Sequence, residues 1–380
     1  MSERRLPELD GVRGIAVATV MLHHFSSTTV PPKGILQNAA AMLLNFGWAG
    51  VDLFFVLSGL LITGILLRTR LASNYFRSFY ARRCLRIFPI AYLSIGAWFW
   101  VVAPLFRHFH VPEYFNGIPS GVSYHSIDQF WFWLYLENWG IGHNPVAIGH
   151  FWSLAIEEQF YTIWPLVVFL YARRMKPICI AIMAVALIVR ASLLLSGFSS
   201  DALYHYTFCR FDELAAGALL ATVLFEGGAT QGFRRAALMA ISLLCAVVIL
   251  ESSSIFATPA MSVFGPSLLA VSFAGLLSLA MAPPPWLTAA LSARPLRALG
   301  KYSYAMYVFH YPIILVVRQV VRAEFHGFWG QMLLTMAAGF LITYLVAVLS
   351  WNLIEKKMSA FKEHFRANVS EPRGTAAVAV

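Results

Sequence analysis

Charged side chains are scarce in this chain of 380 residues. Asp, Glu, Lys and Arg make up only 12% of it, whereas soluble domains carry about 25%. The hydrophobic fraction of 59% indicates an integral membrane protein instead. Acidic residues are the rarer sign, and the net charge is +10. Because the basic residues fall in short clusters between apolar runs, they fit membrane topology, and we expect no nucleic-acid partner.

Cysteine is scarce as well, which bears on metals and disulfides. No CxxC spacing occurs among the four cysteines, Cys84, Cys179, Cys209 and Cys245. This argues against a zinc site and against a disulfide scaffold. The segment near residues 107–150 adds four histidines without the helical pairing of a metal motif, His108, His110, His125 and His143. We therefore expect no bound metal.

Long apolar runs, by contrast, are abundant. Crossing about 30 Å of hydrocarbon takes about 20 residues, and such runs predict about ten spans. They lie near residues 11–30, 46–67, 86–106, 151–172, 177–196, 206–225, 236–251, 266–282, 302–321 and 329–352. We expect an all-α, polytopic transmembrane helix bundle of residues 1–354, followed by a disordered tail at 355–380. The first run lacks a small-residue cleavage site, so we expect an uncleaved first span. We also expect no appended soluble domain.

Basic residues are distributed unevenly between the two sides of this predicted bundle. If the N-terminus is cytoplasmic, the outer segments hold little beyond Lys33, Arg107 and Arg322. The basic clusters then fall on the inner side, as the positive-inside rule requires. We therefore expect both termini in the cytoplasm.

The run from Leu9 to Phe25 carries ionisable groups at both ends of an otherwise apolar helix. Arg13 and His24 are eleven residues apart, so they share a helical face about 16 Å apart, while His23 points about 80° away. Ionisable groups at such depth are costly and usually functional, which suggests a polar track through the bilayer. The alternative is a topogenic arginine and a histidine satisfied inside the bundle.

The second span places Asp52 near its outer end, in the stretch GWAGVDLFFVLSG. An outward-running first helix puts His24 in the outer half as well, so the two could approach each other. A carboxylate beside an imidazole fixes its tautomer and makes it a better general base. Gly47, Gly50 and Gly59 would let helices pack closely there.

The fourth span begins GHFWSLAIEEQFY and keeps carboxylates near its outer boundary. His150, Ser153 and Glu157 can share one helical face. Glu157 and Glu158 must line a polar cavity or be protonated, and either state suits acid–base or hydroxyl-binding work. The alternative is an interfacial edge where both carboxylates are hydrated.

The fifth and sixth spans add two cations and two anions on the outer side, Arg190, Arg210, Asp212 and Glu213. Such groups can neutralise one another, so we favour pairing between the spans. Direct substrate contact is the alternative, and Arg210 and Asp212 are its candidate residues.

The ninth span sets Ser303, Tyr307 and His310 on one face. His310 lies near the midplane, either as a buried, hydrogen-bonded histidine or as a group lining a tunnel. 

Arg82, Arg83 and Arg86 stand at the cytoplasmic entry of the third span. Arginine forks suit phosphate recognition, although these residues also satisfy the positive-inside rule.

The predicted outer segment gathers aromatic side chains, Trp131, Trp133, Tyr135 and Trp139. One interpretation is an amphipathic helix resting at the membrane interface. The other is a platform on which sugar rings stack.

Six motifs occur in a fixed order, at the edges of spans or inside them: LDGVRGIAV, GVDLFFVLSG, RRCLRIFP, HFWSLAIEEQFY, RFDELAAGALLA and YSYAMYVFHYP. Together they resemble the acyltransferase 3 family of polytopic membrane O-acyltransferases, over nearly the whole chain. The resemblance implies transfer of an acyl group, commonly acetyl, from cytoplasmic acyl-CoA. The acceptor would be a hydroxyl on an extracytoplasmic or lipid-linked carbohydrate, and the location a bacterial inner membrane. A small secreted acceptor such as a macrolide, or a polytopic transporter, are the alternatives.

The resemblance also implies roles for single residues. It points to Arg13 and His24 as a functional pair, to Arg83 and Arg86 near the donor, and to Glu157 and Glu158 in the fourth span. Two positions depart from the family pattern. The histidine is doubled as His23–His24, where the shared face favours His24. Phe151 replaces the usual threonine, so no hydroxyl contact is expected there.

These arguments combine into one expected mechanism. The CoA nucleotide sits against Arg82, Arg83 and Arg86, and its arm passes Arg13 and His310. His24, oriented by Asp52, removes the proton of an acceptor hydroxyl that attacks the thioester. Glu157 or Glu158 positions the acceptor. No serine or cysteine stands in an obvious nucleophile–base pair, so we favour single displacement, with acylation of His24 as the alternative.

Overall fold

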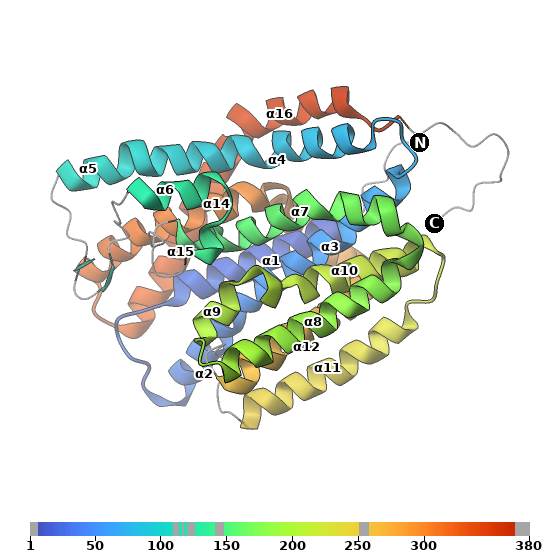
Figure 1. The fold of residues 1–380 in the computed structure, drawn as a ribbon. Helices are drawn as coiled ribbons and strands as arrows, with labels where there is room; N and C mark the ends of the chain where they lie inside the picture. Colours follow the sequence, from blue (N-terminus) through green and yellow to red (C-terminus); the bar gives the residue numbers. More distant parts are fainter. Residues whose placement is uncertain are drawn as a thin grey trace.

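The protein folds into a bundle of long helices packed side by side (Figure 1). The computed structural model describes residues 7–108, 114–115, 118–119, 126–140, 148–250 and 258–368. Within these residues the only strands are the short antiparallel pair β1 (Tyr114–Phe115) and β2 (Ile118–Pro119). The predicted all-α fold class is therefore confirmed.

Each predicted span overlaps one of ten helices, although α4 begins eleven residues before its predicted span and α10 five residues after. These helices are α1 (Pro7–Ser26), α3 (Gly50–Thr69), α4 (Tyr75–Ala97), α7 (Trp152–Tyr171), α8 (Met175–Leu195), α10 (Phe211–Phe225), α11 (Gln231–Leu250), α12 (Pro259–Ala280), α14 (Arg294–Glu324) and α15 (Phe328–Ser350). Shorter helices join them, namely α2 (Gly34–Asn45), α5 (Ala103–His108), α6 (Ser126–Trp133), α9 (Ser200–His205), α13 (Pro285–Leu291) and α16 (Lys356–Phe361).

Short 3-10 and π turns complete the path. The 3-10 turns are η1 (Phe46–Ala49), η3 (Glu137–Trp139), η4 (Gly149–Phe151), η5 (Ala172–Arg174), η6 (Thr207–Cys209) and η8 (Lys362–Phe365). The π turns are η2 (Trp98–Val102) and η7 (Trp351–Glu355).

Length and hydropathy alone support a multi-pass membrane protein. Among the described residues, 7 helical stretches are long and apolar enough to cross a membrane, and one of them, Gly149–Leu195, contains both α7 and α8. Helices α1 and α10 fall outside this set. Helix α1 carries ionisable side chains at both ends, and α10 is 15 residues long. The count of ten spans and the cytoplasmic termini stay predictions.

Glycines set how closely the central helices approach. A Cβ added to Gly300 of α14 would lie 1.8 Å from the carbonyl O of Asp10 in α1. A Cβ on Gly59 of α3 would lie 1.9 Å from the carbonyl O of Leu214 in α10. Gly47 and Gly50 abut the backbone of α1 in the same way, so the predicted close packing at these glycines is confirmed. The result is a fixed pairing of α1 with α14 and of α3 with α10.

The predicted disordered tail, 355–380, is structured in its first part. Residues 356–365 form α16 and η8, which lie along α4 (Figure 1). Ser78 Oγ donates to the carbonyl O of Phe365 at 2.7 Å, and Asn74 Nδ2 donates to that of Arg366 at 2.8 Å. Ile354 packs against the main apolar core. These contacts order a segment whose charged composition had predicted disorder, while residues 369–380 lie outside the described chain.

Candidate active site

Two adjoining cavities lie between α1, α3, α4, α7 and α14. The larger, about 470 Å³, is the arginine cavity, lined by the basic side chains Arg13, Arg82, Arg83, Arg86, Lys301 and Lys362. The smaller, about 100 Å³, is the glutamate cavity, lined by the polar side chains Ser58, Ser153, Glu157, Tyr161 and Tyr307. Arg13, Arg83 and Arg86 line both cavities. The structure thus brings together the predicted arginines of α1 and α4.

The arginine cavity carries a surplus of positive charge. Arg82 and Arg83 both project into it with Arg86, because residues four and three apart lie side by side on a helix. Its lining contains only two acidic residues, Glu355 and Glu363, against six basic ones. Such a site suits a ligand with several phosphates, since guanidinium forks bind phosphate oxygens.

Glu157 is the polar centre of the glutamate cavity. Ser58 Oγ donates to its Oε1 at 2.7 Å, and the Tyr161 hydroxyl donates to its Oε2 at 2.9 Å. The Arg83 guanidinium lies 4.9 Å from the centre of the Tyr161 ring. A carboxylate that accepts two hydrogen bonds beside a cation is held in one orientation. Glu157 therefore has the position that the sequence predicted for a cavity-lining glutamate.

Ser58 and Tyr161 were missed by the sequence analysis. Tyr161 could have been found, because it lies four residues after Glu157 and hence on the same helical face. Ser58 lies on a different helix, so only the packing of α3 against α7 reveals it.

Glu158, the neighbouring carboxylate, has a different environment. It is buried and does not line either cavity. Of the two adjacent glutamates, Glu157 is the one placed to meet a ligand in the cavity.

A chain of hydrogen bonds connects two histidines with the backbone of α14. His24 Nδ1 and His310 Nε2 are 2.9 Å apart, and His310 Nδ1 lies 2.6 Å from the carbonyl O of Tyr307. A carbonyl oxygen only accepts, so the proton of neutral His310 is on Nδ1 and its Nε2 accepts from His24. This leaves the lone pair on Nε2 of His24, which is the form that a general base needs.

His310 is fully buried, as one of the two interpretations from sequence expected. It does not line either cavity, so the cavities do not support its predicted contact with the CoA arm. Its position follows from the glycine-mediated approach of α14 to α1.

Tyr307 separates the histidines from the glutamate cavity. Its hydroxyl lies 2.5 Å from Ser153 Oγ and donates to the carbonyl O of His150 at 2.9 Å. Its ring centre is 5.4 Å from that of His310. The His150 ring, also buried, packs 4.8 Å from His310. His150 and Ser153 are therefore close together, as their spacing predicted, but only Ser153 lines the cavity.

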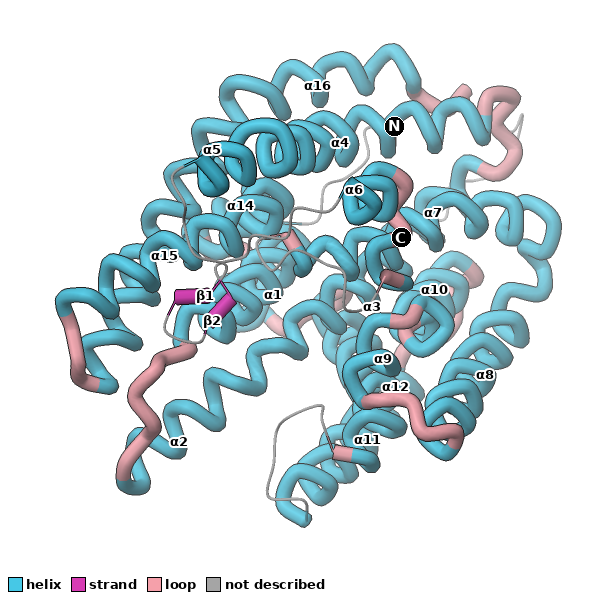
Figure 2. Tube along the Cα trace, turned by 60° about the vertical axis from the view of Figure 1, so that its left-hand side comes forward, coloured by secondary structure: helices cyan, strands magenta, loops and turns pink. Residues whose placement is uncertain are grey.

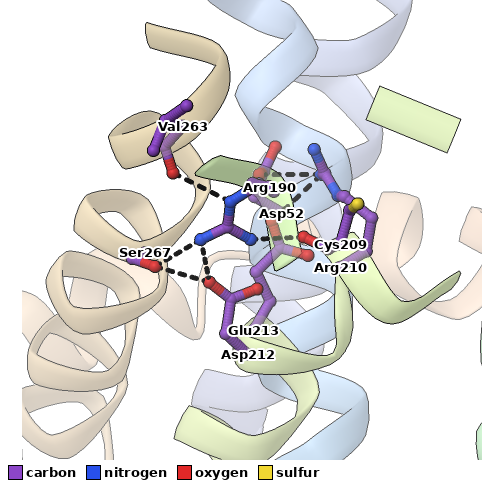
Figure 3. Close-up of polar contacts among 8 residues, drawn as sticks. All are labelled: Asp52, Arg190, Cys209, Arg210, Asp212, Glu213, Val263 and Ser267. Atoms are coloured by element: carbon purple, nitrogen blue, oxygen red, sulfur yellow. Dashed lines mark hydrogen bonds and ion pairs between the residues drawn. The ribbon is translucent and has the colours of Figure 1, made fainter. Parts of the chain in front are cut away.

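Asp52 does not orient His24, and that prediction is wrong. Its Oδ1 accepts from Arg210 Nη2 at 2.9 Å, and Arg210 also lies 3.0 Å from Glu213 Oε1 (Figure 3). The physical reason is the close approach of α3 to α10 at Gly59, which turns Asp52 toward α10 and away from α1. The side chain that bonds to His24 is instead His310.

Arg190 and Asp212 form a second buried ion pair next to the first (Figure 3). The two groups are 2.7 Å apart and neither side chain is exposed. Arg210 and Asp212 both lie outside the lining of the two cavities. The pairing between spans that we favoured is therefore observed, whereas the predicted substrate contact through these two residues is not.

The aromatic segment packs on the bundle within its described part, 126–140. Trp133 stacks on Trp100 with ring centres 5.3 Å apart, and Trp139 stacks on Tyr206 at 5.2 Å. Tyr135 is buried. His110, His125 and His143 lie outside the described residues.

One known protein family matches nearly the whole chain. Residues 6–351 match the family profile described as "Acyltransferase domain". The chain belongs to this acyltransferase family. No solved structure matches the acyltransferase closely enough to be compared.

Among curated proteins, the acyltransferase is similar to bacterial O-acetyltransferases. It is 29% identical to the peptidoglycan O-acetyltransferase OatA of Listeria monocytogenes, over 96% of this chain and 58% of that protein. It is 28% identical to the O-acetyltransferase OatA of Staphylococcus aureus, over 98% and 60%. It is 32% identical to YrhL of Bacillus subtilis, named as a candidate peptidoglycan O-acetyltransferase, over 93% and 55%. The chain thus spans little more than half the length of these relatives.

Proposed function

We propose that this protein transfers an acetyl group from acetyl-CoA to a hydroxyl of a cell-envelope carbohydrate, with residues 1–354 as its catalytic membrane domain. The proposal places it in a bacterial inner membrane. Two of the relatives are named as O-acetyltransferases, and peptidoglycan is the acceptor in the name of one of them. The observation that carries the proposal is that the arginine cavity adjoins the glutamate cavity, whose lining residue Tyr307 packs against His310 of the His24–His310 pair.

The donor fits the arginine cavity by its charge. The CoA nucleotide carries several phosphates, and the cavity offers six basic side chains against two acidic ones. Arg13 lies about 16 Å from His24 along α1, a distance comparable with a pantetheine arm. With its nucleotide at Arg82, Arg83 and Arg86, the donor would place the thioester toward the histidines.

His24 acts as the general base in the transfer. Its Nε2 takes the proton of the acceptor hydroxyl while the hydroxyl oxygen bonds to the thioester carbonyl carbon. The carbon–sulfur bond then breaks, and the CoA thiolate leaves and takes up a proton. His310 holds His24 in the required tautomer through the 2.9 Å hydrogen bond. Glu157, fixed by Ser58 and Tyr161, lines the path that the donor occupies.

Reconstitution tests this function. The purified protein in liposomes receives radiolabelled acetyl-CoA on one side and peptidoglycan fragments on the other, and label in alkali-labile esters is counted. General-base removal typically costs 10²–10⁴-fold, so we expect His24→Ala to lower the rate by at least about 100-fold.

The neighbouring histidine supplies the control. His23 does not bond to His310, so His23→Ala should keep most of the rate. Wild-type rates in correctly folded His24→Ala would exclude His24 as the base. Glycan movement without ester formation would support a transporter instead.

A further inference from the structure

One wall of the arginine cavity comes from beyond the family match. The match ends at residue 351, yet six later residues line the cavity, Ile354, Glu355, Met358, Ser359, Lys362 and Glu363. They belong to η7, α16 and η8. The ribbon view and the tube view both show α16 lying along α4, the helix that carries the arginines (Figures 1 and 2).

This wall is fixed to α4 by hydrogen bonds rather than by the ligand. Asn74 uses both ends of its amide, since Nδ2 donates to the carbonyl O of Arg366 and Oδ1 accepts from the backbone N–H of Asn368, each at 2.8 Å. Ser78 Oγ donates to the carbonyl O of Phe365 at 2.7 Å. The wall is therefore in place before a donor arrives.

Lys362 is the basic side chain that this wall adds. It lines the cavity with Arg82, Arg83 and Arg86, and no ion pair involving it occurs in the described part of the chain. Glu363, its acidic neighbour, pairs with Arg366 on the same turn. The positive charge of Lys362 thus remains available to an anion in the cavity.

We propose that Lys362 is a donor-binding residue whose ammonium contacts a phosphate of the acyl-CoA nucleotide. Residues 354–366 then form a wall of the donor site. The inference rests on the proposed function, because it assumes that acyl-CoA occupies the arginine cavity. The ligand chemistry is a phosphate, which a lipid headgroup could also supply, so the test separates the two sources.

Steady-state kinetics in liposomes test the assignment. Loss of one charged hydrogen bond to phosphate should raise the KM for acetyl-CoA in Lys362→Ala by about 10-fold, with kcat unchanged. Lys362→Arg should restore most of the affinity. The control is Lys357→Ala on the adjoining helix α16, because Lys357 is exposed and does not line the cavity.

Each possible result either supports or refutes the assignment of Lys362 to the donor site. A wild-type KM in Lys362→Ala, with active wild-type protein, overturns this assignment alone, whereas an inactive wild-type protein overturns the proposed function. The same kinetics are repeated in micelles of a maltoside detergent, which contains no phosphate. Persistence of the KM difference supports the nucleotide phosphate, and its disappearance assigns Lys362 to lipid and refutes the inference.

Discussion

The buried ion pair Arg190–Asp212, which joins α8 to α10 and also contacts α12, allows a specific prediction about stability. Arg190 donates to the carbonyl O atoms of Cys209 and Val263, to Ser267 Oγ and to Asp212 Oδ2. Neither the Arg190 nor the Asp212 side chain is exposed to solvent. Figure 3 shows these contacts. Arg190→Met removes the cation and leaves the Asp212 carboxylate, among the residues that the structure describes, with the Ser267 hydroxyl at 2.6 Å as its one side-chain hydrogen-bond partner.

The expected cost follows from that stranded charge. Breaking one side of a buried pair costs about 3–5 kcal/mol, whereas replacing both partners by apolar residues is often nearly neutral. We therefore expect Arg190→Met to lose about 3–5 kcal/mol of unfolding free energy. The double variant Arg190→Met with Asp212→Leu should recover much of that loss.

Unfolding in mixed detergent micelles measures both values. The exposed pair Lys176–Glu226, with side chains 45% and 42% exposed, is the matched control. Its variant Lys176→Met should change the free energy by less than about 1 kcal/mol. If Asp212→Asn and Arg190→Met kept wild-type stability but raised the KM for the acceptor, the pair would be a substrate site and our structural account would be wrong.

Two further predictions concern the histidine pair and the glycine contact. His310→Leu should lower kcat by about 10–100-fold without changing the KM for acetyl-CoA, whereas His310→Gln, which can both accept and donate, should retain far more activity. Equal rates in the two variants would exclude a role in holding the His24 tautomer. Gly300→Val should lose at least about 3 kcal/mol, because a Cβ would lie 1.8 Å from the carbonyl O of Asp10. Thermal midpoints check this against Gly327→Ala, where nothing lies within 4 Å, and equal midpoints would contradict the close packing.

The helices of this fold could be predicted because a bilayer leaves the backbone few options. Apolar runs in lipid must satisfy their own hydrogen bonds, so each long run predicts a helix. The shared face of Arg13 and His24 also follows from helical periodicity alone. Both kinds of inference use only residues within one segment.

The partners across helices could not be predicted in this way. His24 and His310 are 286 residues apart, and their contact depends on how α1 is turned against α14. The expected partner, Asp52, has the right chemistry and depth, yet α3 turns it toward Arg210. Lys362 was missed because the charged composition of the C-terminal segment predicted disorder. Only the structure shows that this segment packs against α4.

The central claim is acetyl transfer with His24 as the base, and mass spectrometry of envelope glycans tests it most directly. Three strains of the host are compared, the parent, a deletion of this gene, and the deletion complemented with His24→Ala. We predict that deletion removes an ester-linked acetyl group from one glycan and that the His24→Ala gene fails to restore it. Unchanged acetylation on deletion, with a glycan accumulating on one side of the membrane, would contradict the account.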